Sequence, residues 1–249
     1  MNKELYAETF KVESVHWWFL GLHELVEDRL RQYRRENPRV ESLKIFDAGC
    51  GTGQLMVRLQ EYGSVEGADS SEEALAYCKS RGLQNVRFQD LNEWIPPDSV
   101  YDVIVSLDVL YHQGIRDDIA VLRKFYCALK ERGILILNLP AFDCLWRDHD
   151  VAVHAARRYR RNRLIPSLKE MGFEIQIQSY RLSYLFLPSA VKAWFERANK
   201  KRKFRSDLKG EVPPLWNRFL LQMNRLENQL IKRVNLPWGV SLFIVARKP

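Results

Sequence analysis

A glycine-rich segment, DAGCGTG at positions 47–53, is the part of this sequence best suited to holding a ligand. It follows an apolar stretch typical of a buried strand and precedes a stretch with helical periodicity. Glycine permits a tight turn and lets the backbone approach a ligand where a Cβ would collide. A nicotinamide-binding fingerprint would place its third glycine at position 54, which is Gln54 here. The spacing therefore predicts a ligand-binding turn that differs from that fingerprint.

Two more polar positions come at the ends of the next two predicted strands. An acidic side chain at the place of Asp69 can accept both hydroxyls of a ribose. Asp90 and Leu91 can reach an adenine amino group and its apolar face. Each position alone is also compatible with an ordinary turn or a solvated acid. The ordered set predicts a pocket for an adenosine-containing ligand.

These positions require a sheet whose strands end at one edge. Short apolar strands alternate with helices from position 43 to about 180, which predicts an α/β fold with a doubly wound sheet. An amphipathic helix precedes the sheet at 16–33, and helical patterns at 183–200 and 215–232 come before a last strand at 241–248. We therefore expect three parts: an N-terminal helical cap (1–40), a core (41–181 plus 239–249) and a basic helical insertion (182–238).

Taken together, the motifs resemble those of the class I S-adenosylmethionine-dependent methyltransferases. The resemblance rests on IFDAGCGTGQL, VEGADSSEEAL, FQDLNEW, YDVIVSLDVLYH and LKERGILILNLPA, and it covers about 43–180 plus the last strand. It implies a Rossmann-like, seven-stranded, mostly parallel sheet, with the last strand antiparallel beside the fifth. It also implies S-adenosylmethionine as cofactor and S-adenosylhomocysteine as product. The positions that it assigns to the cofactor pocket are Asp47, Gly49, Cys50, Gly51, Gly53, Asp69, Ser70, Asp90, Leu91, Ser106 and Asp108.

A narrower resemblance involves HWWF at 16–19 and LWRDHDVAVHAARRY at 145–159, which look like segments of one bacterial branch of the family. Leu22 and Ala155 depart from that branch, which commonly has an arginine and often a second histidine there. The resemblance therefore indicates the reaction and leaves the substrate open. The residues that we expect to contact a substrate are Trp17, Trp18, Tyr111, Asp150, Arg157, Arg158 and Tyr159. Trp17 and Trp18 could alternatively anchor the N-terminal helix, and the arginines could belong to a solvated helix start.

The reaction that the resemblance implies needs little covalent help from the protein. Methyl transfer from a sulfonium is an in-line displacement that depends on orientation and on the exclusion of water. A hydroxyl acceptor would need a base, for which His112, His149 and His154 are the candidates. A carboxylate acceptor would need none, and no metal ion is expected.

Charge and composition narrow the setting. The net charge of +8 is concentrated in five arginines at 157–163 and in a net +6 at 191–210, which could attract an anionic substrate, phosphates or lipid headgroups. The four cysteines form no CxxC pair, which favours a reducing compartment. We expect no secretion signal and no membrane-spanning segment. The protein is therefore expected in the cytoplasm, with the segment 182–232 resting on the inner membrane surface, forming a homodimer or packing ordinarily.

Three functions follow in decreasing order of support. The first is O-methylation of a small or lipid-linked acceptor, such as a sugar hydroxyl or a carboxylate. The second is methylation of RNA or tRNA held by the basic patches. The sequence SLDVLYH, where base-methylating relatives often carry Asn/Asp-Pro-Pro-Tyr or Pro-Cys, argues against a nucleic-acid partner. The third is cofactor binding without catalysis.

Overall fold

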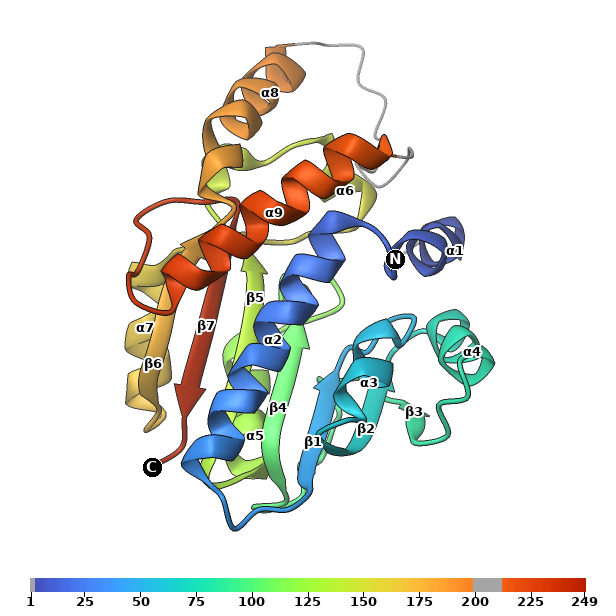
Figure 1. Ribbon diagram of the computed structural model, residues 1–249, viewed down its shortest axis with the longest axis vertical. Coiled ribbons are helices and arrows are strands. Elements are labelled where there is room, and N and C mark those ends of the chain that lie inside the picture. The colour runs from blue at the N-terminus through green and yellow to red at the C-terminus, as the bar shows by residue number, and fades with distance from the viewer. Residues whose placement is uncertain (1–2, 199–211) are drawn as a thin grey trace.

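The computed structural model describes residues 3–198 and 212–249, and a sheet of seven strands runs through the described part (Figure 1). The basic run at 200–205 lies outside these residues. The strands are β1 (Leu43–Ala48), β2 (Gly63–Asp69), β3 (Val86–Phe88), β4 (Tyr101–Leu107), β5 (Leu129–Pro140), β6 (Glu174–Arg181) and β7 (Ser241–Arg247). The helices are α1 (Lys3–Val12), α2 (Trp17–Glu36), α3 (Gln54–Leu59), α4 (Glu72–Ser80), α5 (Asp118–Ala128), α6 (Asp148–Ala152), α7 (Arg161–Glu170), α8 (Phe186–Ala198) and α9 (Pro214–Ile231).

The strand order is β3-β2-β1-β4-β5-β7-β6. All pairs from β3 to β5 are parallel, whereas β7 pairs antiparallel with both β5 and β6. Strand order reverses between β1 and β4, and open α/β sheets bind ligands in the crevice at such a point. The predicted seven-stranded, mostly parallel sheet with an antiparallel last strand is confirmed.

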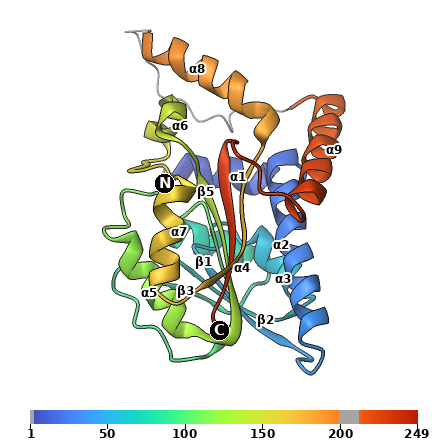
Figure 2. The ribbon, with the colours of Figure 1, turned by 90° about the vertical axis from the view of Figure 1, so that its left-hand side faces the viewer.

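Helices cover both faces of the sheet because its central strands are apolar on both sides. Ile45 and Val103 belong to a buried cluster that includes apolar residues of α2 and α3, whereas Phe46 and Ile104 belong to another that includes residues of α5 and α7. Figure 2 shows α5 and α7 on one side of the sheet and α2 and α3 on the other.

The N-terminal section contains two helices where the sequence predicted one. The expected amphipathic helix is α2, which begins at Trp17 because the His16 imidazole accepts a hydrogen bond from the Trp18 N–H at 3.2 Å. The helix that the sequence missed is α1. It is held near α4 by Glu13, whose carboxylate accepts from Arg81 Nη2 at 2.6 Å, and by a ring contact of Phe10 with Tyr77 at 4.6 Å.

The last third of the chain contains the two helices that its periodicity predicts. α9 lies alongside α2 in front of the sheet, and α8 projects from the end of the molecule to which β4 and β5 point (Figure 1). The division into cap, core and insertion stays a prediction, since α9 shares a layer with α2. Within the described residues, no helix combines the length and the apolar composition that a bilayer crossing demands.

Candidate active site

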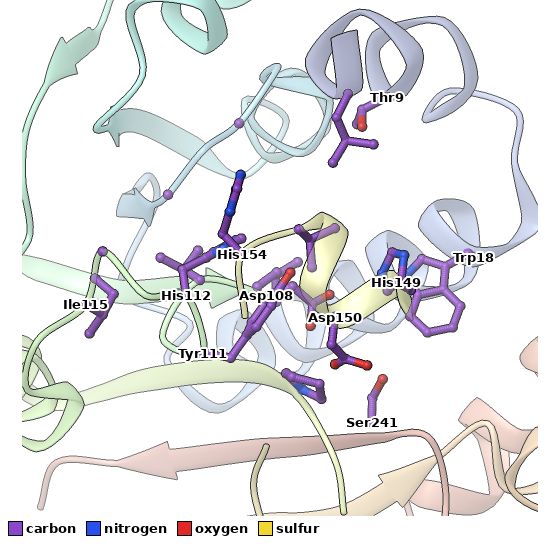
Figure 3. A pocket seen from close by; sticks show the side chains of 18 of the residues that line it. Thr9, Trp18, Asp108, Tyr111, His112, Ile115, His149, Asp150, His154 and Ser241 are labelled. Carbon is purple, nitrogen blue, oxygen red and sulfur yellow. The ribbon is translucent and has the colours of Figure 1, made fainter. Parts of the chain in front are cut away.

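A cavity of about 680 Å³ lies at the carboxyl ends of β1, β2, β4 and β5. Residues from α1, α2 and the loops after these strands line it, together with α6 and the start of α8. Figure 3 shows side chains from these separate segments converging on one space. The topology accounts for this, because parallel strands bring the loops that follow them to the same edge.

Most of the residues predicted to bind the cofactor line this cavity. They are Gly49, Gly51, Asp69, Ser70, Asp90, Leu91 and Asp108. Asp47, Cys50, Gly53 and Ser106 lie outside the lining. Gly53 has a structural reason to be glycine, since its φ is +85° and a Cβ there would lie 2.6 Å from the Leu83 side chain.

The loop after β1 is held in shape by Asp69. The Asp69 carboxylate accepts the backbone N–H of Gly51 at 2.9 Å and that of Ser71 at 3.0 Å. It thereby joins the glycine loop to the start of α4. Burial raises the pKa of Asp69, while the hydrogen bonds from Gly51 and Ser71 oppose that rise.

Two buried carboxylates at the carboxyl ends of β1 and β4 have raised pKa values. Burial raises the pKa of Asp47 to about 7, and the charges of Asp69 and Glu13 add to the effect. Burial likewise raises the pKa of Asp108 to about 6, although Asn138 Nδ2 donates to both of its oxygens at 3.0 Å. Buried carboxylates with raised pKa values are incompletely compensated, so Asp108, which lines the cavity, favours a cationic ligand there.

The sequence analysis did not predict that α1 contributes side chains to the cavity lining. Leu5, Tyr6 and Thr9 line the cavity, and Thr9 is visible at its rim in Figure 3. No motif marks α1, and its apolar residues are too few to show a strong period. The proximity of Tyr6 to Asp69 and Ser71 follows only from the packing of α1 against α4.

The histidines proposed as bases come from the segments that follow β4 and β5. His112, His149 and His154 all line the cavity, as do Tyr111 and Trp18 (Figure 3). The His112 ring stacks on Tyr111 with centroids 4.2 Å apart. Burial lowers the pKa of His112 to about 4, which keeps the imidazole neutral near pH 7 and makes it a weak base.

The arginine cluster divides into two groups in the structure. Arg158 lines the cavity but is already engaged: its guanidinium pairs with both Asp150 oxygens at 2.8 and 2.9 Å, and Nη1 donates to the Ala141 carbonyl at 2.8 Å. Arg157 and Tyr159 do not line the cavity. Arg157 donates to the Ile115 carbonyl at 2.8 Å, and the Tyr159 hydroxyl donates to Asp118 at 2.7 Å. The expectation that Arg157 and Tyr159 contact a substrate directly therefore finds no support in this geometry.

One arginine that sequence reasoning left out does line the cavity. Arg147 lies directly before α6, where its backbone N–H donates to Asp150 Oδ2 at 2.8 Å. The signal that could have found it is its place within the Trp-x-x-His-Asp segment. Together with His149 and Arg158 it adds basic side chains to the cavity lining, which also includes the carboxylate of Asp150.

The aromatic pair at the start of α2 takes part both in the cavity wall and in the packing of the helix. Trp17 and Trp18 line the cavity, and Trp17 also belongs to a buried cluster with Leu182, Leu221 and Val240. The pair thus attaches α2 to α9 while forming an apolar part of the cavity wall, where Trp18 lies next to His149 (Figure 3).

The comparisons with known proteins agree with the fold. Residues 40–198 match a family profile described as "Methyltransferase domain". The trans-aconitate 2-methyltransferase of Rhodococcus jostii is 32% identical over 130 residues, which cover 50% of this chain and 48% of that protein. The chain spans about half the length of the curated relatives that it matches.

Solved structures extend the likeness over nearly the whole chain. A methyltransferase of Haloferax volcanii, solved in a complex with the Trm112 methyltransferase activator, aligns with a TM-score of 0.61 at 14% identity, covering 99% of this chain and 95% of that one. The magnesium protoporphyrin IX methyltransferase of Synechocystis with bound S-adenosylmethionine aligns with a TM-score of 0.52 at 18% identity, covering 93% and 81%. At these identities the likeness concerns the fold alone.

Proposed function

The chain belongs to the methyltransferase-domain family, and we propose that it transfers the methyl group of S-adenosylmethionine to a carboxylate oxygen of a small or lipid-linked acceptor. One observation carries the proposal: a single cavity is lined both by carboxylates, among them Asp69 and Asp108, and by basic side chains, among them Arg147 and His149. Such a cavity complements a cationic methyl donor and an anionic acceptor placed side by side. The similarity to a trans-aconitate 2-methyltransferase supports an acceptor of this chemical class.

The part of the cavity around the glycine loop fits S-adenosylmethionine. When bound, S-adenosylmethionine supplies a methyl group that its sulfonium has already activated. Gly49 has a φ of +88°, and a Cβ there would lie 2.2 Å from the Val109 side chain, so only glycine lets the loop take this path. Asp69 would accept the ribose hydroxyls, and Asp90 with Leu91 would meet the adenine. The charges of Asp47 and Asp108 would stabilise the cationic end of the molecule.

The chain's other residues would act by orientation and exclusion of water. Arg147 and His149 would hold the acceptor carboxylate in line with the methyl group. Trp17 and Trp18 would keep water away from the reacting atoms. A carboxylate is already deprotonated near neutral pH, so no side chain has to remove a proton from it.

The state of His112 favours a carboxylate over a hydroxyl acceptor. A general base works best when its pKa lies near the working pH. His112, with a pKa lowered to about 4, is poorly matched to that task. Its neutral ring could instead form a hydrogen bond with the methyl acceptor without a change of charge.

Binding of S-adenosylmethionine is expected to strengthen about tenfold or more between pH 5.5 and pH 8. Asp47 and Asp108, with pKa values near 7 and 6, lose their protons over this range, and the ionised forms attract the sulfonium. The raised pKa values of Asp47 and Asp108 have the opposite effect on the stability of the free protein. Its free energy of unfolding falls as pH rises from about 4 to about 7, because burial disfavours the ionised carboxylates. Isothermal titration calorimetry across the pH range measures the affinity.

S-adenosylhomocysteine is the matched control for this pH series, since it has the same amino and carboxylate groups but no sulfonium charge. Its affinity should change much less with pH. Parallel curves for the two ligands would contradict a role for the buried carboxylates in sulfonium binding.

Replacing Arg147 with methionine is expected to raise the KM for the acceptor about tenfold or more, because a charge-assisted contact to the carboxylate is lost. The affinity for S-adenosylmethionine should stay within about twofold, since Arg147 is assigned to the acceptor and not to the cofactor. Acceptor titrations that follow S-adenosylhomocysteine formation, over a panel of small carboxylic acids, measure this effect. The matched control is Arg160→Met, because Arg160 does not line the cavity and pairs with Asp143 at 3.6 Å. Equal KM values for both variants would exclude Arg147 from acceptor binding.

A further inference from the structure

The apolar side of α9 faces away from the protein. Large apolar side chains recur at helical spacing along one side of this helix, and their exposed fractions range from 47% to 79%. They are Leu215, Trp216, Phe219, Leu226 and Leu230. A pattern of this kind normally marks the side that packs on the core. Packing within the chain, one of the three alternatives for segment 182–232, therefore does not describe these five side chains among the described residues.

Polar contacts hold α9 in this orientation. Asn228 Nδ2 donates to the Gly21 carbonyl at 2.7 Å, and the Glu227 carboxylate accepts the Ser183 N–H at 2.8 Å. Asn224 approaches α2 so closely that a Cβ on Gly21 would lie 2.1 Å from its amide nitrogen. If α9 were rotated so that its apolar stripe faced the core, Asn228 and Glu227 would lose these hydrogen bonds.

α8 presents a second stripe of the same kind. Leu187, Val191, Trp194 and Phe195 follow one another at helical spacing and are all exposed. Both views place α8 and the first turns of α9 at the same end of the molecule, the end to which β4 and β5 point (Figures 1 and 2). Leu185, directly before α8, and Ser189, near its start, line the cavity, so this end of the molecule adjoins the candidate active site.

The charges on the two helices are distributed unequally. Each helix has one carboxylate, and both face the protein: Glu196 accepts the Asp148 N–H at 2.9 Å, and Glu227 is buried. Exposed positions carry the basic side chains Lys192, Arg197 and Arg218, of which Lys192 lies 3.8 Å from Glu196 and Arg197 donates to the Cys144 carbonyl at 2.6 Å. Apolar and aromatic side chains flanked by cationic ones complement a surface with a negative charge and an apolar interior. A second copy of the same stripes would bring cationic side chains together.

We propose that the exposed stripes of α8 and α9 dock the protein on an anionic lipid surface, with the cavity beside the membrane. The aromatic side chains enter the region of the headgroups, and the basic side chains contact lipid phosphates. Access of a lipid-linked acceptor to the cavity rests in addition on the proposed function, whereas docking itself does not.

Vesicle flotation with the full chain tests the docking. The protein should float with vesicles of phosphatidylcholine that contain phosphatidylglycerol, and binding should be about tenfold weaker with phosphatidylcholine alone and at high salt. The double variant Trp194→Glu/Trp216→Glu should bind the anionic vesicles at least about tenfold more weakly. The matched control is Ile95→Glu, because Ile95 is 87% exposed but lies on the loop between β3 and β4. This variant should bind like the wild type.

Three results would overturn the proposal. The wild type could fail to float with anionic vesicles, or Ile95→Glu could lose binding as strongly as the double variant. Light scattering could also show a dimer that the double variant dissociates, without vesicle binding, which would assign the stripes to a second copy. Calorimetry with S-adenosylmethionine and turnover of soluble acceptors, measured without vesicles, test the proposed function separately and should not change in either variant.

Discussion

Replacing Arg158 with alanine is expected to lower the free energy of unfolding by about 3 to 5 kcal/mol. The side chains of Arg158 and Asp150 are only 3% and 2% exposed, and they form a bidentate pair. Without the guanidinium, the Asp150 carboxylate loses its cationic partner in a buried site, and the Ala141 carbonyl loses a donor. The loop after β5 would consequently loosen, and Arg147 and His149 with it. Urea denaturation followed by circular dichroism measures the loss.

An exposed arginine–carboxylate pair provides the control. Arg116 pairs with Glu93, but their side chains are 67% and 70% exposed. Since solvent screens exposed pairs, Arg116→Ala should change stability by less than about 1 kcal/mol. A loss of similar size in both variants would show that burial does not determine the strength of the Arg158 pair.

Replacing Asp69 with alanine is expected to weaken S-adenosylmethionine binding by about 1 to 3 kcal/mol, roughly 5- to 150-fold. The carboxylate lines the cavity, and its removal leaves ribose hydroxyls without a charged acceptor. It also frees the N–H groups of Gly51 and Ser71, so the glycine loop loses the contact that joins it to α4. Calorimetric titration of the variant measures the affinity.

Glu72→Ala is the matched control for that experiment. Glu72 is an exposed carboxylate in the first turn of α4 and does not line the cavity. Its removal should leave the affinity within about twofold. Thermal unfolding without ligand shows whether Asp69→Ala is folded, and an unchanged affinity in a folded variant would refute the ribose assignment.

The part of the cavity around the glycine loop could be predicted from the sequence because its residues lie in short strand–loop–helix motifs. Gly49 follows β1, Asp69 ends β2 and Asp90 comes two residues after β3, and the sheet topology brings the ends of parallel strands together. The strand–loop–helix pattern is visible in sequence, so seven of the eleven predicted cofactor positions line the cavity. The roles of these residues, and the resemblance of 16–19 and 145–159 to one bacterial branch, stay predictions.

The basic residues of the cavity lining were harder to predict, because neighbours in the sequence point in different directions. Arg157, Arg158 and Tyr159 are consecutive, yet only Arg158 lines the cavity. Which of them does so depends on the turn geometry after α6 and on partners from distant elements, such as Ile115 and Asp118. No sequence period encodes these contacts.

The amino-acid sequence by itself determined the sheet, the cofactor loop and the helical character of α9, because these depend on short-range periodicity and on the conformational freedom of glycine. Only the tertiary structure decided that α1 borders the cavity, that Asp150 neutralises Arg158, and that the apolar side of α9 faces outward. Helical periodicity states which residues share a side of a helix. The direction of that side follows from hydrogen bonds such as that of Asn228 with Gly21, whose partners lie far apart in the chain.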